Sequence, residues 1–331
     1  MSFEKETGRD LYFAQLEKEL AELIDPDTGL LDEKYAIEVD CPVCHSRENK
    51  TLFIKRGYTF VRCFTCGMIY TNPQVKQKIV NECYKGESYS TELWMDVLKN
   101  TKETEWRQDY YNSILEHIEN IVGKGSLLDV GCAVGHFLDI ARTAGWETTG
   151  LELSETGHRY CTENLNLNVL NKTIEESELP KESFDAITLI GVLEHITDPI
   201  DIIESCKKLL KKGGLICVIV PNVYSLINMV IHQEAVTFDG RNHLLYFSTK
   251  TLTNLFEKLN IEVLLSDTVL TGAPNLWKYL QYNDPYSEGD GSEYLPEKLK
   301  VFCDDVQGQK DIEAWILKMN LGLRLRLIGK K

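Results

Sequence analysis

The chain has 331 residues, enough to bury a sizeable core, and its 43% hydrophobic and 26% charged residues are ordinary for a globular protein. Its net charge of −15, from 36 Lys and Arg against 51 Asp and Glu, argues against a polyanionic partner such as nucleic acid. The longest apolar run, "LICVIV" (215–220), is too short for a membrane-spanning segment. The start "MSFEKETGRD" lacks a signal-peptide pattern, so we expect a cytoplasmic protein.

Residues 1–35 are predicted to form an acidic helical arm. Residues 1–40 hold twelve acidic against four basic side chains. Within "LYFAQLEKELAELI" (11–24), Leu16, Leu20 and Leu23 recur at helical spacing, and "DPDTG" ends the pattern. We expect the acidic side chains to lie on the solvated face of this helix.

Residues 36–73 carry two CxxC pairs, "CPVC" (Cys41, Cys44) and "CFTCG" (Cys63, Cys66). Two such pairs supply four thiolates, which complete a closed tetrahedral Zn²⁺ site of the structural kind. The segment is therefore predicted to be a zinc ribbon whose folding depends on the metal. Its acidic and basic residues nearly balance, which favours substrate covering or domain packing over nucleic-acid binding.

Residues 74–104 are interpreted as a helical linker, and from Leu127 strands alternate with helices, as in a parallel α/β sheet. We expect strands at 126–130, 147–152, 168–171, 184–190, 214–220 and 261–268. The terminal "LRLRLIGKK" is predicted to be an antiparallel last strand, with a helix continued from 309 as the competing interpretation. The stretch 271–318 is less regular and is interpreted as an insertion.

The segment "LLDVGCAVGHFL" (127–138) combines a short strand, a turn of small residues and the start of a helix, a device that brings backbone close to a ligand. Glu152 ends the next strand about twenty residues later, where a carboxylate can accept hydrogen bonds from a ribose diol. Spacing alone does not separate a dinucleotide from S-adenosylmethionine. The glycine pattern favours S-adenosylmethionine, because Leu138 stands where a dinucleotide fingerprint needs its third glycine.

The segment 105–331 resembles class I S-adenosylmethionine-dependent methyltransferases. Four stretches carry the resemblance, in the family's order: "LLDVGCAVGHFL", "TGLELSE", "NKTIEESELPKESFDAITLIGVLEHITDP" and "LLKKGGLICVIVPN". The resemblance implies a Rossmann-like α/β fold with a seven-stranded sheet whose last strand is antiparallel.

The resemblance also implies which residues hold the cofactor. The methionine part would lie against the glycine turn and the residue after the fourth strand, and the nucleoside against the residues after the second and third strands. The residues on the methionine side are Asp129, Gly131, Ala133, Gly135 and Gly191. Glu152 would hold the ribose, and Ile174 and Glu175 would flank the adenine. The family usually has glycine where this chain has Ala133. We expect Ala133 to keep a negative φ, so that the site survives.

Together with the ribbon, the chain resembles bacterial ribbon-fused methyltransferases, including sugar C-methyltransferases, over the first two-thirds of their length and without their additional C-terminal domain. This implies a small polar or glycan-linked acceptor methylated on oxygen or carbon. Two alternatives stay open: an RNA methyltransferase that binds nucleic acid through the ribbon, and a noncatalytic interaction protein with this fold. The sequence carries no signal for the oligomeric state.

Two histidines are candidates for the catalytic base. His243 in "DGRNHLLYFSTKTL" stands where the sugar C-methyltransferases have an acid–histidine pair, but Asn242 replaces the acid. The alternative is a histidine that only fixes its loop. His195 in "GVLEHITDP" is interpreted as shaping the site or as a base. Some relatives bind a divalent metal through ExxEH, but here Gly191 leaves out the first ligand.

Overall fold

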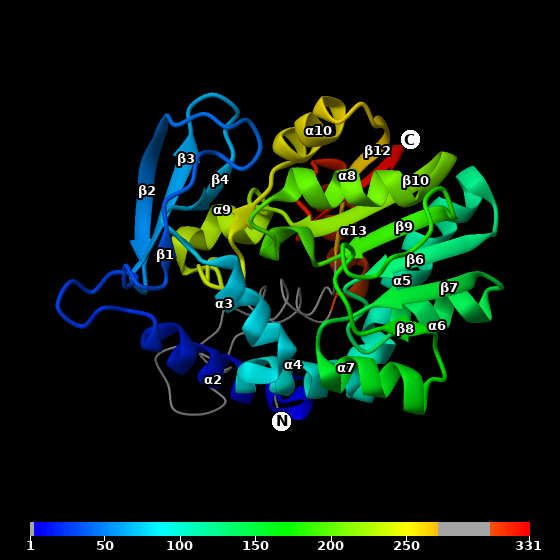
Figure 1. Ribbon diagram of the computed structural model, residues 1–331, viewed down its shortest axis with the longest axis horizontal. Coiled ribbons are helices and arrows are strands. Elements are labelled where there is room, and N and C mark those ends of the chain that lie inside the picture. Colours follow the sequence, from blue (N-terminus) through cyan, green and yellow to red (C-terminus); the bar gives the residue numbers. More distant parts are fainter. Residues whose placement is uncertain (1–2, 271–304) are drawn as a thin grey trace.

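The computed structural model describes residues 3–270 and 305–331. A seven-stranded sheet with the strand order β12-β13-β10-β9-β6-β7-β8 forms its centre (Figure 1). Strand β13 runs antiparallel to both β10 and β12, whereas β10, β9, β6, β7 and β8 are parallel. The expected Rossmann-like α/β sheet with an antiparallel last strand is confirmed.

The strands of this sheet lie close to their predicted positions. They are β6 (Ser126–Val130), β7 (Glu147–Leu151), β8 (Val169–Leu170), β9 (Phe184–Ile190), β10 (Leu210–Pro221), β12 (Glu262–Val269) and β13 (Arg324–Lys330). Most residues of the central strands are buried, and their β-branched and leucine side chains form the core on both faces. This pattern is typical of a parallel sheet covered by helices on both sides.

Helices precede the sheet and follow its strands. Before it come α3 (Gln77–Glu82), the π-turn η1 (Cys83–Glu87), α4 (Tyr89–Lys99) and α5 (Thr101–Val122). The segments that connect its strands contain α6 (His136–Thr143), α7 (Glu155–Arg159), η2 (Tyr160–Asn164), η3 (Leu193–His195), α8 (Pro199–Leu209), α9 (Leu226–Ile231), η4 (His232–Glu234) and α10 (Thr249–Lys258). In the described residues, no helix is both long and apolar enough to span a bilayer.

The stretch predicted to be an irregular insertion ends in a regular helix, α13 (Val306–Lys318), so that prediction is wrong for its last part. A cap explains where this helix starts: the Asp305 side chain accepts a hydrogen bond from the backbone N–H of Gly308. Residues 271–304, the rest of the expected insertion, lie outside the described residues.

The cysteine-rich segment forms a small sheet with the strand order β11-β4-β3-β2, at the left of Figure 1. Strands β2 (Asn49–Lys55), β3 (Tyr58–Cys63) and β4 (Ile69–Thr71) belong to this segment. The fourth strand, β11 (Leu245–Tyr246), comes from the methyltransferase-like part, and its Leu245 pairs with Tyr70. Strands β1 (Ala36–Ile37) and β5 (Gln74–Val75) pair separately. The loop with His243 therefore ends as a strand of the ribbon sheet.

Further contacts fasten the ribbon to the rest of the chain. Lys55 Nζ donates to the carbonyl of Ala235 at 2.9 Å, and Lys258 Nζ donates to the carbonyl of Val43 at 2.8 Å. The Phe60 ring meets Phe238 edge-on with 5.6 Å between the ring centroids. Buried aromatic area of this kind stabilises an interface more than exposed ion pairs do.

The N-terminal arm consists of α1 (Phe3–Thr7) and α2 (Arg9–Glu22), joined at Gly8. The expected solvated acidic face is wrong at Glu19, which is 9% exposed. Its carboxylate accepts hydrogen bonds from Ser88, Ser90 and Arg241. The acid is buried because these donors replace water around its charge.

Candidate active site

A cavity of about 530 Å³ opens at the carboxyl ends of β6, β7 and β9, where ligands bind in open α/β sheets. Eight of the predicted site residues line it: Gly131, Ala133, Glu152, Ile174, Glu175, Gly191, His195 and His243. The cavity also reaches α2, α4 and α5, through side chains such as Leu16, Trp94 and Tyr111. Asp129 and Gly135 are not among the lining residues.

At two positions of the turn after β6, the backbone lies too close to other side chains to carry a Cβ atom. Gly131 has φ 70°, and a Cβ there would lie 2.6 Å from Val192 Cγ2. Gly135 has φ 76°, and a Cβ there would lie 2.8 Å from the Cys161 sulfur. The glycine at each position is required by both the left-handed backbone and the lack of space.

The expectation that Ala133 keeps a negative φ is wrong, because its φ is +52°. This left-handed conformation costs a non-glycine residue about 1–2 kcal/mol. In this conformation the Ala133 N–H donates to Glu152 Oε2 at 2.7 Å. A charge-assisted hydrogen bond to a buried carboxylate contributes a comparable free energy, which offsets the strain.

Glu152 is held rigidly at the cavity wall. It is 6% exposed, and its two oxygens each accept one backbone N–H, from Ala133 and from Ser154 at 2.7 Å. Burial raises the pKa of Glu152, and these backbone hydrogen bonds counteract the rise. An ionised carboxylate has about four acceptor positions, so capacity remains for two hydroxyl donors.

Asp129 lies beneath the turn. It is 3% exposed and accepts a hydrogen bond from Thr188 Oγ1 at 2.6 Å. Burial raises the pKa of Asp129 to about 7, with the Thr188 bond opposing the rise and the Glu152 charge adding to it. In the ligand-free protein this carboxyl ties β6 to β9.

His243 is one of the residues that line the cavity. Its Nδ1 lies 2.9 Å from the carbonyl of Thr237, so Nδ1 carries the proton and Nε2 is left as an acceptor. Asp239 Oδ2 lies 3.8 Å from the same Nδ1, close enough to stabilise an imidazolium. The Asp239 Oδ1 atom caps the loop by accepting the backbone N–H groups of Arg241, Asn242 and His243.

Asp239 was not predicted from the sequence as the acid beside His243. Only the position directly before the histidine, occupied by Asn242, was expected to hold that acid. An acid four residues before a histidine in a glycine-containing loop was the available signal. The carbonyl of Asn242 has a different task, since it lies 2.7 Å from Nδ1 of His195. The two histidine rings, from different segments, lie with their centroids 4.8 Å apart.

The same Nδ1 of His195 also lies 2.9 Å from the hydroxyl of Tyr84. Burial lowers the pKa of His195, and the nearby Glu194 charge partly opposes this. Glu194 is 2% exposed, and its Oε2 has no hydrogen-bond partner among the described residues. Glu194, His195 and His243 offer three ligand atoms within 4.8 Å of one another, a set compatible with a divalent cation even without a ligand at Gly191.

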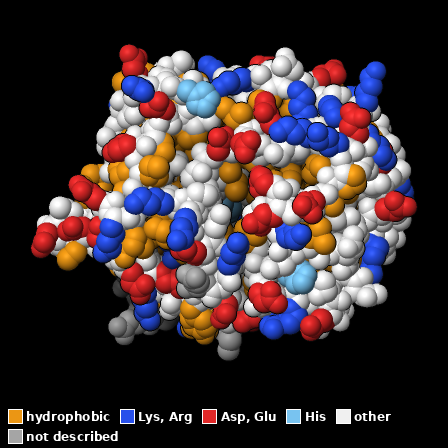
Figure 2. Space-filling model, viewed as in Figure 1, with side chains coloured by type: hydrophobic (Ala, Val, Ile, Leu, Met, Phe, Trp, Pro, Cys, Tyr) orange, Lys and Arg blue, Asp and Glu red, His pale blue; other side chains and the backbone are white. Residues whose placement is uncertain are grey.

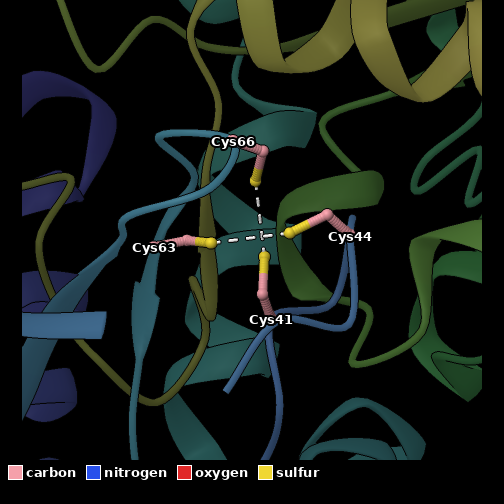
Figure 3. A group of neighbouring side chains, drawn as sticks. All are labelled: Cys41, Cys44, Cys63 and Cys66. Atoms are coloured by element: carbon pink, nitrogen blue, oxygen red, sulfur yellow. Dashed lines mark hydrogen bonds between the residues drawn. The ribbon is translucent and has the colours of Figure 1, made fainter. Parts of the chain in front are cut away.

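The four ribbon cysteines converge on one point (Figure 3). Their sulfur atoms lie within 4.8 Å of one another, with Cys41 3.5 Å from Cys66 and Cys44 3.5 Å from Cys63. All described cysteines are free thiols. Four converging thiols without a disulfide fit a tetrahedral Zn²⁺ with Zn–S bonds of about 2.3 Å.

Residues 104–266 match the family described as "Methyltransferase domain". Two similar relatives are named ubiquinone biosynthesis O-methyltransferase. The protein of Actinobacillus pleuropneumoniae (serotype 5b, strain L20) is 32% identical over 162 residues, which is 46% of this chain and 64% of the relative. That of Haemophilus ducreyi is 31% identical over 158 residues, 45% of this chain and 64% of the relative.

The aligned part of the chain thus spans under two thirds of these relatives. Among solved structures, the plantazolicin methyltransferase BpumL, bound to an analogue and S-adenosylhomocysteine, superposes with a TM-score of 0.51. It is 12% identical, and the match covers 77% of this chain and 95% of that one, a likeness of fold alone. Residues 104–266 thus carry a methyltransferase domain, and the superposition agrees with this in fold.

Proposed function

We propose that the protein transfers the methyl group of S-adenosylmethionine to the oxygen or carbon of a small polar acceptor. One observation supports the proposal: Glu152, whose carboxylate is held by backbone N–H groups, and His243, whose Nδ1 contacts the carbonyl of Thr237, line the same cavity. The names of the two relatives favour oxygen as the acceptor atom. The lining is mostly apolar, with hydrogen-bonding side chains such as Asn81, Thr197 and Asn242 that a sugar-containing acceptor could use.

The residues divide the work between binding and proton transfer. S-adenosylmethionine supplies an electrophilic methyl group on a sulfonium. Glu152 would accept both ribose hydroxyls, Ile174 and Glu175 would flank the adenine, and the turn at Gly131 and Ala133 would face the methionine part. His243 Nε2 would take the proton of an acceptor hydroxyl as the new carbon–oxygen bond forms and the carbon–sulfur bond breaks. Asp239 would stabilise the resulting imidazolium.

His195 is proposed as a positioning residue. Its Nδ1 holds the carbonyl of Asn242 and so fixes the loop that carries His243. Burial lowers the pKa of His195, which favours its neutral form beside His243.

The ribbon is proposed to bind one structural Zn²⁺ through Cys41, Cys44, Cys63 and Cys66. Its role would be to hold the His243 loop through β11. The alternative of nucleic-acid binding is disfavoured, since four of the five basic side chains of the ribbon are engaged within the chain, Arg47 among them through Asp40. Lys55 contacts Ala235, Arg62 contacts Tyr224 and Arg56 pairs with Glu17. On the face in Figure 2, basic and acidic side chains are interspersed.

Calorimetric titration with S-adenosylhomocysteine tests the donor site. We expect saturable one-to-one binding by the zinc-loaded protein. Glu152→Gln should weaken it about tenfold or more, because a neutral amide replaces the acceptor of two hydroxyls. The matched control is Glu155→Gln, on the exposed surface of α7. If the wild-type protein does not bind S-adenosylhomocysteine, the proposal fails.

A further inference from the structure

Two further polar side chains line the cavity, those of Arg324 and Tyr110. They are separate from the residues proposed to bind S-adenosylmethionine and from the two histidines. Arg324 is the first residue of β13 and is half-buried. A methyl group placed on Gly191 would lie 3.3 Å from Arg324 Nη1, so the guanidinium reaches the turn after β9. Among residues 3–270 and 305–331, no ion pair or hydrogen bond engages this guanidinium. By contrast, Arg107 in the same wall is paired with Glu103.

Tyr110 gives a second, independent observation. Its side chain, on α5, is 8% exposed, and its hydroxyl has no hydrogen-bond partner among the described residues. A buried hydroxyl without a partner costs about 1–3 kcal/mol, so it is normally satisfied by a ligand or water. Burial raises the pKa of Tyr110 and the positive charge of Arg324 opposes the rise, which agrees with the two groups being close.

The order of the strands indicates whether S-adenosylmethionine or the methyl acceptor would contact Arg324 and Tyr110. Glu152 directly follows β7, whereas Arg324 begins β13, four strands away across β6, β9 and β10. At about 4.8 Å per strand, the separation along the sheet edge is about 19 Å. The nucleoside end of the donor would lie at Glu152, and the two histidines and Arg324 would lie beyond the turn at Gly191. This is the acceptor half of the cavity.

Resting on the proposed function, we infer that Arg324 and Tyr110 form an oxyanion subsite that binds a carboxylate or phosphate group of the methyl acceptor. A guanidinium donates two parallel hydrogen bonds to such a group, and the tyrosine hydroxyl adds a third donor. The acceptor class narrows to small hydroxylated molecules that carry an acidic group. Neutral analogues would leave the guanidinium unsatisfied and bind more weakly.

The test uses the full zinc-loaded chain and inorganic phosphate as the probe. In saturating S-adenosylhomocysteine, thermal unfolding is followed in sodium phosphate and in sodium chloride of equal ionic strength. We expect phosphate to raise the Tm of the wild-type protein in a saturable way. Arg324→Met should weaken this response at least fivefold, and Tyr110→Phe about twofold. Arg142→Met, an exposed arginine on α6, is the control and should keep the wild-type response.

Three results would overturn the inference. The first is a wild-type protein without a phosphate effect, and the second is an Arg324→Met variant that responds as the wild type does. The third is a tenfold loss of S-adenosylhomocysteine affinity in Arg324→Met, which would assign the guanidinium to the methionine carboxylate of the donor. Arg324→Lys keeps the charge and distinguishes lost binding from misfolding. If S-adenosylhomocysteine does not bind at all, the proposed function fails, and the phosphate titration of the ligand-free protein still tests Arg324.

Discussion

Arg241 Nη1 donates to Glu19 Oε2 at 2.9 Å, joining two residues that are 222 positions apart. The pair is almost fully buried, with side-chain exposures of 4% and 10%. Glu19 lies on α2, whereas Arg241 lies two residues before His243. The N-terminal helix therefore contributes to the position of the candidate base, together with the ribbon strand β4 on the other side of the loop.

Breaking this pair should destabilise the protein strongly. Burial by itself would raise the pKa of Glu19, but the hydrogen bonds from Ser88, Gln15, Ser90 and Arg241 lower it to about 2. Arg241→Met leaves that charge buried without its counterion, so we expect a loss of about 3–5 kcal/mol in the free energy of unfolding. Urea unfolding measures the loss. Glu17→Gln, in the exposed pair with Arg56, is the control and should change little.

The carboxylate of Glu19 should make the protein less stable as the pH falls. Since its folded pKa lies below the unfolded value, its stabilising contribution is complete above about pH 4.5 and is lost as the pH falls toward 2. Glu19→Gln should therefore unfold with a shallower dependence on pH between 5 and 2.5. An unchanged dependence would show that the carboxylate is not stabilised by these partners.

Removing the candidate base should affect turnover and not donor binding. We expect His243→Ala to lower kcat about 10²- to 10⁴-fold, with S-adenosylhomocysteine affinity within twofold of the wild type. Asp239→Asn keeps an oxygen for the three backbone N–H groups but removes the charge beside His243, and should lower kcat about tenfold. The control is His232→Asn, at an exposed histidine. Near-normal turnover in His243→Ala would leave this histidine a structural role only.

Loss of zinc should disable catalysis through the His243 loop. Cys63→Ser removes one thiolate, and we expect metal analysis to fall from about one zinc per chain to well below one. Because β11 pairs with β4, turnover should fall more than tenfold, while S-adenosylhomocysteine affinity changes less than threefold. Cys83→Ser, at a half-buried cysteine outside the cluster, is the control. Full turnover by a zinc-free variant would contradict the proposed role of the ribbon.

Asp129 should make the ligand-free protein less stable as the pH rises. Its folded pKa of about 7 lies above its ordinary value of 3.8, so between these values the folded state holds more protons than the unfolded state. We expect the free energy of unfolding, relative to Asp129→Asn, to fall by up to about 1.4 kcal/mol per pH unit between pH 5 and 7. Urea unfolding at four pH values checks this. A difference that does not vary with pH would mean that Asp129 is ionised in the folded protein.

Much of this protein was determined by local sequence patterns. The strand–turn–helix around Gly131 and the strand before Glu152 repeat a short device that small residues and apolar runs mark locally in the sequence. The two CxxC pairs predicted their own convergence, because each turn of four residues presents two sulfur atoms to one point. The alternation of strands and helices likewise predicted the parallel strands, while the terminal "LRLRLIGKK" and the resemblance predicted the antiparallel last strand.

Other features were decided only by the tertiary structure. The left-handed backbone of Ala133 depends on the carboxylate of Glu152, nineteen residues later. The burial of Glu19, the entry of β11 into the ribbon sheet and the approach of Arg324 to Gly191 join segments that are distant in the chain. No local pattern encodes such contacts, because the free energy of burying a charge or adding a strand depends on what the whole fold brings beside it.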